Sequence, residues 1–130
     1  MTRRGAVPDR RLTPHELARR AAELALDKKA DNPVLIDLRA LGHVCDWYVV
    51  VAGDSEPQVK AIAVRIEQGL RELGEEPWHV EGMSERQWVL LDYVDVVVHV
   101  FHARARENYL LERLWGDAPR ETVDAGPDGP

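Results

Sequence analysis

The sequence has almost no cysteine, a single phenylalanine and no long hydrophobic run. Cys45 is the only cysteine among 130 residues, which excludes an intramolecular disulfide and any zinc site built from several cysteines. No apolar run approaches the roughly 20 residues that a membrane helix needs, and residues 1–12 lack the apolar segment of a secretory signal. These absences predict a soluble, cytoplasmic protein.

Positive charge is also scarce, except near the N-terminus. The chain carries 17 Lys and Arg against 23 Asp and Glu, a net charge of −6. Residues 1–12 hold four Arg and one Asp, whereas residues 117–130 hold four acids and one Arg, so the excess acid belongs to the middle of the chain. Because an acidic domain repels phosphate groups, the sequence favours a basic protein as partner over direct recognition of nucleic acid.

Hydrophobic periodicity predicts one α/β (α+β) domain over residues 13–116, between a disordered basic leader at 1–12 and a disordered tail at 117–130. A five-stranded sheet with flanking helices is expected, in the order helix, strand, strand, helix, strand, strand, strand, helix. These elements fall at 13–29, 34–38, 46–52, 55–74, 77–81, 88–91, 96–101 and 109–115. The unit at 46–81 should cross over right-handedly if its two strands are parallel neighbours.

Residues 88–115 form the most strongly patterned stretch. Two apolar runs flank a short acidic break at 92–95, which predicts a hairpin. In the first strand Trp88, Leu90 and Asp92 share one face, while Leu91 and Tyr93 belong to the other.

A phosphate site is conceivable where Gly53, Asp54 and Ser55 lead from a strand into a helix, because a helix N-terminus offers free N–H groups. However, neither GxGxxG nor GxxxxGK[ST] is present, and Asp54 and Glu56 would repel an anion. Ser55 followed by Gln58 three residues later is typical of a helix cap, which is the better interpretation.

Carboxylates at Asp46, Glu81, Asp92 and Asp95 invite comparison with the metal sites of nucleotidyltransferases. In those enzymes an acidic pair follows a Gly-Ser turn by about ten residues, along a strand. This chain has a helix at that spacing, so a two-metal phosphotransfer site is disfavoured.

Histidine and cysteine offer no convincing site either. His99 and His102 would point to opposite faces of one strand, so His99 is better read as a hydrogen-bonded core residue. Cys45 lies near His43, but the sequence shows neither a third residue to orient such a pair nor an oxyanion hole, so a nucleophilic site is disfavoured. We therefore predict no catalytic residue, no metal and no cofactor.

Tryptophan is abundant by contrast, with four residues, Trp47, Trp78, Trp88 and Trp115, against one phenylalanine. Core packing is the plain explanation for each. Trp88 is the exception worth weighing, because it follows the polar residues 84–87 at the start of a strand, where its ring can face solvent. A tryptophan in such a place can anchor an interface with about 2–4 kcal/mol.

Several separated motifs agree in order and spacing with one known family. They are WVLLD at 88–92, DVVVHVF at 95–101, Arg106 with Tyr109, LE at 111–112, LW at 114–115, LIDL at 35–38, Asp46, Gly53 and Ser55, Val59, AIA at 61–63 and EG at 81–82. Over about residues 13–118 the chain resembles the Iojap family, the ribosomal silencing factors. It departs from the family pattern at Cys45 and Asp54, which usually are Thr, and at Val94, which usually is Gly and bears on the turn geometry.

The resemblance implies a repressor of translation rather than an enzyme. Members of the family bind the large ribosomal subunit through large-subunit ribosomal protein fourteen, sterically block association with the small subunit when nutrients are short, and are often homodimers when free. The resemblance also implies a single mixed sheet, like that of nucleotidyltransferases but without the catalytic site. Carried onto this sequence, the partner-binding residues are Trp88, Leu90, Leu91, Asp92, Tyr93 and Asp95.

Two alternatives remain open from the residues. One is a nucleotide-binding enzyme of the nucleotidyltransferase type, which would use residues 53–55 and the carboxylates. The other is a dimeric adaptor whose partner is not the ribosome.

Overall fold

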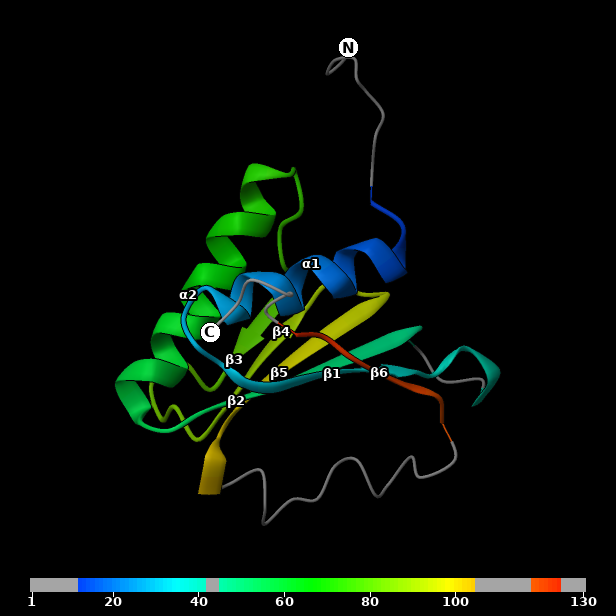
Figure 1. Ribbon diagram of the computed structural model, residues 1–130. Helices are drawn as coiled ribbons and strands as arrows, with labels where there is room; N and C mark the ends of the chain where they lie inside the picture. Colours follow the sequence, from blue (N-terminus) through cyan, green and yellow to red (C-terminus); the bar gives the residue numbers. More distant parts are fainter. Residues whose placement is uncertain (1–11, 42–44, 105–117, 125–130) are drawn as a thin grey trace.

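The computed structural model of the protein describes residues 12–41, 45–104 and 118–124. The described elements are α1 (Pro14–Leu26), β1 (Asp31–Asp37), a short 3-10 helix η2 (Arg39–Leu41), β2 (Trp47–Gly53), α2 (Glu56–Glu72), β3 (His79–Glu81), β4 (Trp88–Asp92), β5 (Val96–His102) and β6 (Arg120–Thr122). One mixed sheet has the strand order β3-β4-β5-β2-β1-β6. Both α1 and α2 cover the same face of it (Figure 1). Within these residues no helix has the length and apolar character to cross a bilayer.

The expected helix starts are confirmed. Thr13 accepts a hydrogen bond from the Glu16 N–H, and the Glu16 carboxylate accepts one from the Thr13 N–H, which completes a capping box. Ser55 caps α2 in the same way, accepting from the Gln58 N–H at 3.2 Å. The first helix ends at Leu26, short of the expected Lys29, because Lys29 takes a left-handed conformation with φ of 62°.

The order of the strands differs from the sequence prediction in one respect. The β4–β5 hairpin is confirmed as an antiparallel pair. However, β2 and β3 are not neighbours, so the condition for the right-handed crossover between them is not met; the parallel neighbour of β2 is β5. α2 carries the chain past two strand positions to the edge of the sheet, and the hairpin returns to fill them (Figure 1).

The sheet has six strands rather than the five expected, because β6 forms within the segment predicted to be a disordered tail. It pairs antiparallel with β1, with Ile36 opposite Arg120 and Val34 opposite Thr122. Val123, which follows it, is buried. The prediction of disorder is therefore wrong for residues 118–124, where pairing with the open edge of β1 outweighs a polar composition. The helix expected at 109–115 lies outside the described residues.

Side chains of β6 and α1 form ion pairs with each other. The Glu121 carboxylate accepts a hydrogen bond from Arg19 and lies 2.8 Å from Nε2 of His15, so one acid on β6 meets two side chains of α1.

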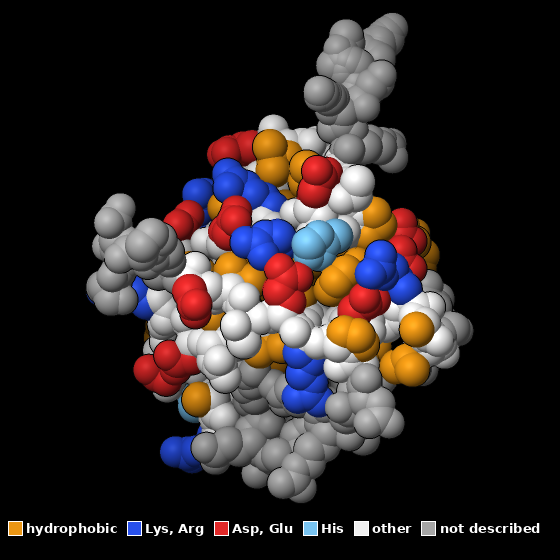
Figure 2. All heavy atoms as spheres, turned by 45° about the vertical axis from the view of Figure 1, so that its right-hand side comes forward, with side chains coloured by type: hydrophobic (Ala, Val, Ile, Leu, Met, Phe, Trp, Pro, Cys, Tyr) orange, Lys and Arg blue, Asp and Glu red, His pale blue; other side chains and the backbone are white. Residues whose placement is uncertain are grey.

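The face turned forward in Figure 2 carries acidic and basic side chains interspersed with small apolar patches. No single sign of charge dominates this side of the molecule.

The core lies mainly between the helices and the sheet. Its largest fully buried side chains from this layer include Leu35, Ile62, Ile66, Leu70 and Leu91. Gly69 of α2 allows the two helices to approach closely. A Cβ at this position would lie only 2.5 Å from Cδ2 of Leu24 in α1. A second, smaller cluster lies on the opposite face of the sheet and contains Val34, Ile36, Leu38, Cys45, Val50, Phe101 and Ala118. Of the helices in the described residues, neither α1 nor α2 covers this second face (Figure 1); we call it the helix-free face, meaning only that it is free of α1 and α2.

Candidate protein-binding surface

Five of the six predicted partner-binding residues divide between the two faces of the sheet, and the sixth, Asp95, lies in the turn between β4 and β5. On the helix-free face, Trp88 stands opposite Phe101, Leu90 opposite His99 and Asp92 opposite Val97. All three predicted residues on this face are partly exposed. This confirms the alternation of faces read from the sequence.

Leu91 and Tyr93 point the other way, into the core beneath the helices, with exposures of 0% and 7%. Leu91 offers no surface to a partner and Tyr93 offers little, so their burial argues against a direct contact role for these two residues. The period of a strand separates these two residues from Trp88, and they share the core-facing side with Val89.

Trp88 is held in place from one side. Its indole Nε1–H donates a hydrogen bond to Nδ1 of His99 at 3.0 Å, and its ring stacks on Phe101 with centroids 5.0 Å apart. The ring is therefore partly buried, yet it also lines a surface pocket. A side chain fixed in this way loses little conformational entropy when a partner covers it.

His99 is the buried, hydrogen-bonded histidine expected from the sequence. Burial lowers its pKa to about 4, so the ring is neutral at pH 7. Because Nδ1 accepts the indole proton, the ring proton belongs on Nε2, which is buried and has no hydrogen-bond partner in the described structure. An edge-on contact with Tyr48, centroids 4.5 Å apart, fixes the ring further.

The loop before β4 is tied down at several points. Gly82 has φ of 85°, and a Cβ there would lie 2.1 Å from the Trp88 carbonyl oxygen. The Arg86 N–H donates to the Gly82 carbonyl at 2.9 Å, and the Gln87 side chain donates to Glu56 at 3.0 Å. The loop thus sits directly on the strand that carries Trp88. Between them lies a pocket of about 320 Å³ lined by Glu81, Gly82, Glu85, Trp88 and Leu90.

The acidic turn after β4 has a structural role. The Asp92 carboxylate accepts the Val94 N–H at 2.7 Å, and the Asp95 carbonyl accepts the N–H groups of Asp46 and Trp47 at 2.8 and 3.1 Å. Val94 takes a φ of 76°, which a β-branched residue rarely adopts. The turn is therefore left-handed at Val94, the position where the family resemblance leads to an expectation of glycine. Asp95 and Val94 are both exposed at its tip.

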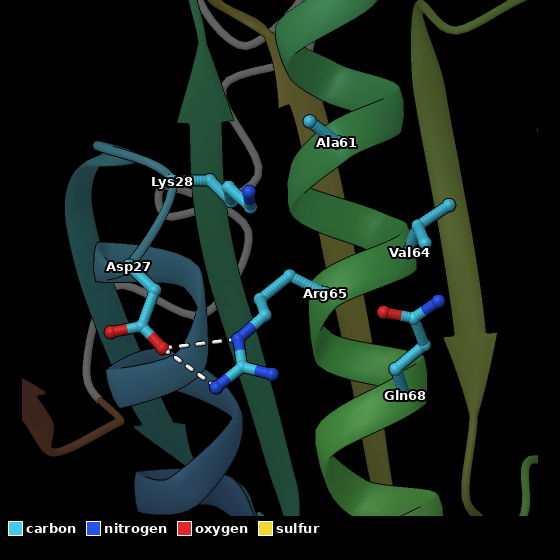
Figure 3. Close-up of a pocket in the computed structure, with 6 residues that line it drawn as sticks. All are labelled: Asp27, Lys28, Ala61, Val64, Arg65 and Gln68. Carbon is cyan, nitrogen blue, oxygen red and sulfur yellow. Dashed lines mark hydrogen bonds and ion pairs between the residues drawn. The ribbon is translucent and has the colours of Figure 1, made fainter.

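A larger pocket of about 470 Å³ lies at the end of α1 beside α2 (Figure 3). Two of its three charged side chains pair with each other, since Nε and Nη2 of Arg65 both lie 3.0 Å from Oδ2 of Asp27. The remaining lining residues, Lys28, Ala61, Val64 and Gln68, include no group poised for chemistry. This pocket belongs to the helix layer and is separate from the surface around Trp88.

The turn at residues 53–55 is confirmed as a helix cap. Gln58 Oε1 accepts the Asp54 N–H at 2.6 Å, while its Nε2 donates to the carbonyls of Lys28 and Lys29 at 3.0 Å. The N–H groups of Asp54 and Gln58, on either side of the start of α2, thus have partners within the chain. In the described ranges, no three His, Cys, Asp or Glu side chains are grouped so as to hold a metal ion.

Cys45 is a poor nucleophile in this setting. Burial raises the pKa of its thiol to about 11, with Asp92 and Asp46 adding to the effect. Its thiol contacts the Trp47 carbonyl at 3.8 Å. The interpretation of a buried, idle thiol fits this environment.

Comparison with known proteins identifies the family of the chain. The sequence profile of the family described as ribosomal silencing factor during starvation matches residues 11–129. The chain belongs to the ribosomal silencing factor family. It is 42% identical over 106 residues to the ribosomal silencing factor RsfS of Bacillus subtilis, spanning 82% of this chain and 90% of that protein. It is 41% identical over 108 residues to the RsfS of Halalkalibacterium halodurans, spanning 83% and 92%.

The fold is shared as well. A crystal structure of a protein from Chromobacterium violaceum superposes with a TM-score of 0.78 at 33% identity, covering 89% of this chain and 98% of that one. The resemblance read from the sequence motifs is therefore confirmed, for the family and for a mixed sheet with flanking helices.

Sequence reasoning missed two features of this ribosomal silencing factor. The bond from Trp88 to His99 depends on cross-strand register, which the sequence does not reveal. The pocket walled by Glu81 and Glu85 depends on how the 82–87 loop folds onto β4. The positive-φ glycine at 82 in the EG motif was the available signal for the second.

Proposed function

We propose that this protein binds the large ribosomal subunit through large-subunit ribosomal protein fourteen and keeps the small subunit from joining. By occupying the surface between the subunits, it lowers translation when nutrients are limiting. The function is that of a cytoplasmic repressor which acts by steric exclusion, and no catalytic step is involved. When free of the ribosome, the protein is a homodimer.

The observation that most strongly supports this proposal is the fixed position of Trp88 on the helix-free face. Its ring is braced by Phe101 and hydrogen-bonded to His99, while Leu90 extends the apolar surface beside it. Aromatic anchors in such partly buried positions dominate the binding energy of many interfaces. Family membership supplies the ribosome as the partner to be tested first.

Charge around this anchor supports a basic partner. Asp92 lies on the same face, and the carboxylates of Glu81 and Glu85 line the adjoining pocket. The chain as a whole carries a net charge of −6. Acidic groups around an apolar anchor speed encounter with a basic protein surface and orient it.

The test compares two tryptophans. Replacing Trp88 by Ala should weaken binding to purified large subunits at least tenfold, from about 2 kcal/mol of lost contact. Trp78→Ala is the matched control, because Trp78 is 76% exposed just before β3 and should bind normally. Affinity is measured by co-sedimentation, and far-UV circular dichroism checks that both variants fold.

A subunit-joining assay completes the test. Wild-type protein should reduce the yield of joined ribosomes from purified subunits, and Trp88→Ala should restore it. Full joining at saturating wild-type protein would contradict the proposal and favour an adaptor with a different partner.

A further inference from the structure

We propose that the pocket beside Trp88 receives an arginine side chain of the protein partner. It rests on the proposed function, because it specifies which chemical group of that partner meets the helix-free face. We call it the acidic pocket; its walls are Glu81, Gly82, Glu85, Trp88 and Leu90, and its volume is about 320 Å³. That volume is at the small end for ligand sites, which typically enclose about 300–1,000 Å³, and it suits one side chain.

The pairing of β3 with β4 defines one wall. Glu81 stands directly opposite Leu90, so its side chain emerges on the same face as Leu90 and Trp88. The opposite wall is the loop that carries Glu85. Gly82 lets this loop lie against the Trp88 carbonyl, where any Cβ would clash at 2.1 Å. Glu81, Glu85 and Trp88 are thereby brought to one small cavity, with the loop backbone lying against β4 at Gly82.

The chemistry of the walls selects a guanidinium group. The indole face of Trp88 attracts a planar cation that stacks on it. Leu90 offers apolar surface to the methylene stem of a long side chain. Two carboxylates can accept the forked N–H donors of arginine, which gives stronger and more directional bonds than a neutral pair. An anion would be repelled, and an apolar side chain would gain nothing from the acids.

The chain's own cations leave these carboxylates open to a partner. Glu81 contacts His79, with Oε2 and Nε2 2.7 Å apart, and Glu85 accepts a hydrogen bond from the Ser84 hydroxyl at 3.3 Å. Arg86 in the same loop directs its Nε–H to the Met83 carbonyl at 3.2 Å. Across the described residues, no Lys or Arg forms an ion pair with either glutamate.

The experiment neutralises the pocket without removing its shape. In the double variant Glu81→Gln/Glu85→Gln, affinity for purified large subunits should fall about tenfold. The control, Glu72→Gln/Asp124→Asn, removes the same charge from exposed positions at the end of α2 and after β6, and should change affinity less than about twofold. At about 0.3 M salt the effect of the control should vanish while that of the pocket variant persists, because contact pairs are screened less than distant charges.

Chemical footprinting identifies the group that enters. Large subunits saturated with wild-type or control protein are treated with an arginine-specific dicarbonyl reagent, and the modified peptides are read by mass spectrometry. One arginine should be protected by both proteins and become reactive when the Glu81→Gln/Glu85→Gln variant is bound at saturation.

The outcomes separate the two proposals. If wild-type protein fails to bind large subunits, both the proposed function and the acidic pocket are overturned. If wild-type protein binds and the pocket variant binds equally well, or if no arginine is protected, the pocket assignment alone is wrong and the docking function stands.

Discussion

The two faces of the sheet differ in how deeply their side chains are buried. On the helix-covered face, Leu91, Val49 and Val98 are fully buried beneath α1 and α2. On the helix-free face, Trp88 and Leu90 of the same strand remain partly exposed. A single five-residue strand thus buries every second side chain and leaves the others partly exposed. The binding role that we propose for the exposed residues can therefore be tested beside core positions that should affect stability alone.

Polar groups on the two faces also differ in their situation. Under the helices, burial raises the pKa of the Tyr93 phenol, and its hydroxyl has no hydrogen-bond partner in the described structure. On the helix-free face, His99 is as deeply buried, but one of its ring nitrogens binds the indole of Trp88. A buried polar group is expensive unless it is bonded. The cost of burying His99 is partly offset by its hydrogen bond to Trp88, the residue that we propose as the binding anchor.

The largest expected effect is a contrast between adjacent leucines. Leu91→Ala should lower the free energy of unfolding by about 3 kcal/mol, because it leaves a cavity in the main core. Leu90→Ala should cost less than about 1 kcal/mol, since its side chain is partly exposed. Urea denaturation at pH 7 measures both. Equal losses would remove the distinction between a scaffold face and a contact face.

Local patterns predicted the parts of the fold that depend on neighbours in sequence. Both capped helix starts and the hairpin around Val94 were predictable, because capping and turn signals act over a few residues. The pairing of β1 with β6 and of β2 with β5 was not, since each joins residues far apart in the chain. Such pairing depends on which strand edges remain free after the rest of the sheet has formed. The polar sequence of β6 contains no pattern that predicts a strand.

The candidate site was predicted in the same partial way. Trp88, Leu90 and Asp92 were placed on one face by alternation alone, and the structure agrees. Leu91 and Tyr93 were transferred with the motif and lie in the core, because a family signature marks packing positions as well as contacts. The proposed binding roles of the residues on the exposed face stay predictions until the tryptophan variants are measured.

A second effect, which reaches a similar size only near pH 4, concerns His99 on the helix-free face. The pKa of His99 falls from 6.5 to about 4 on folding, so the unfolded chain binds the extra proton between these values. Stability should therefore be complete above pH 6.5 and decrease as pH falls toward 4, by up to about 3 kcal/mol. Urea denaturation at pH 4.5, 5.5 and 7 measures the slope.

The matched variant for this slope is His99→Gln. An amide oxygen at this position can still accept from the Trp88 indole, but it does not titrate. The variant should therefore lose much of the dependence on pH between 4 and 6.5 that the wild type shows. Parallel slopes for the two proteins would mean that carboxylates elsewhere, and not the buried histidine, control acid stability.

The smallest expected effect tests whether the edge strand β6 is bound to the helix-covered side by charge or by burial. Glu121 meets His15 and Arg19 of α1 while its side chain remains 35% exposed, so solvent screens the pairs. Glu121→Gln should cost only about 0.5–1 kcal/mol in urea denaturation, and added salt should shrink the difference. Asp124→Asn, just beyond the strand at an exposed position, is the control and should be neutral. A loss above about 2 kcal/mol would mean that the ion pairs, rather than the burial of Val123 and the ladder to β1, hold β6 in the sheet.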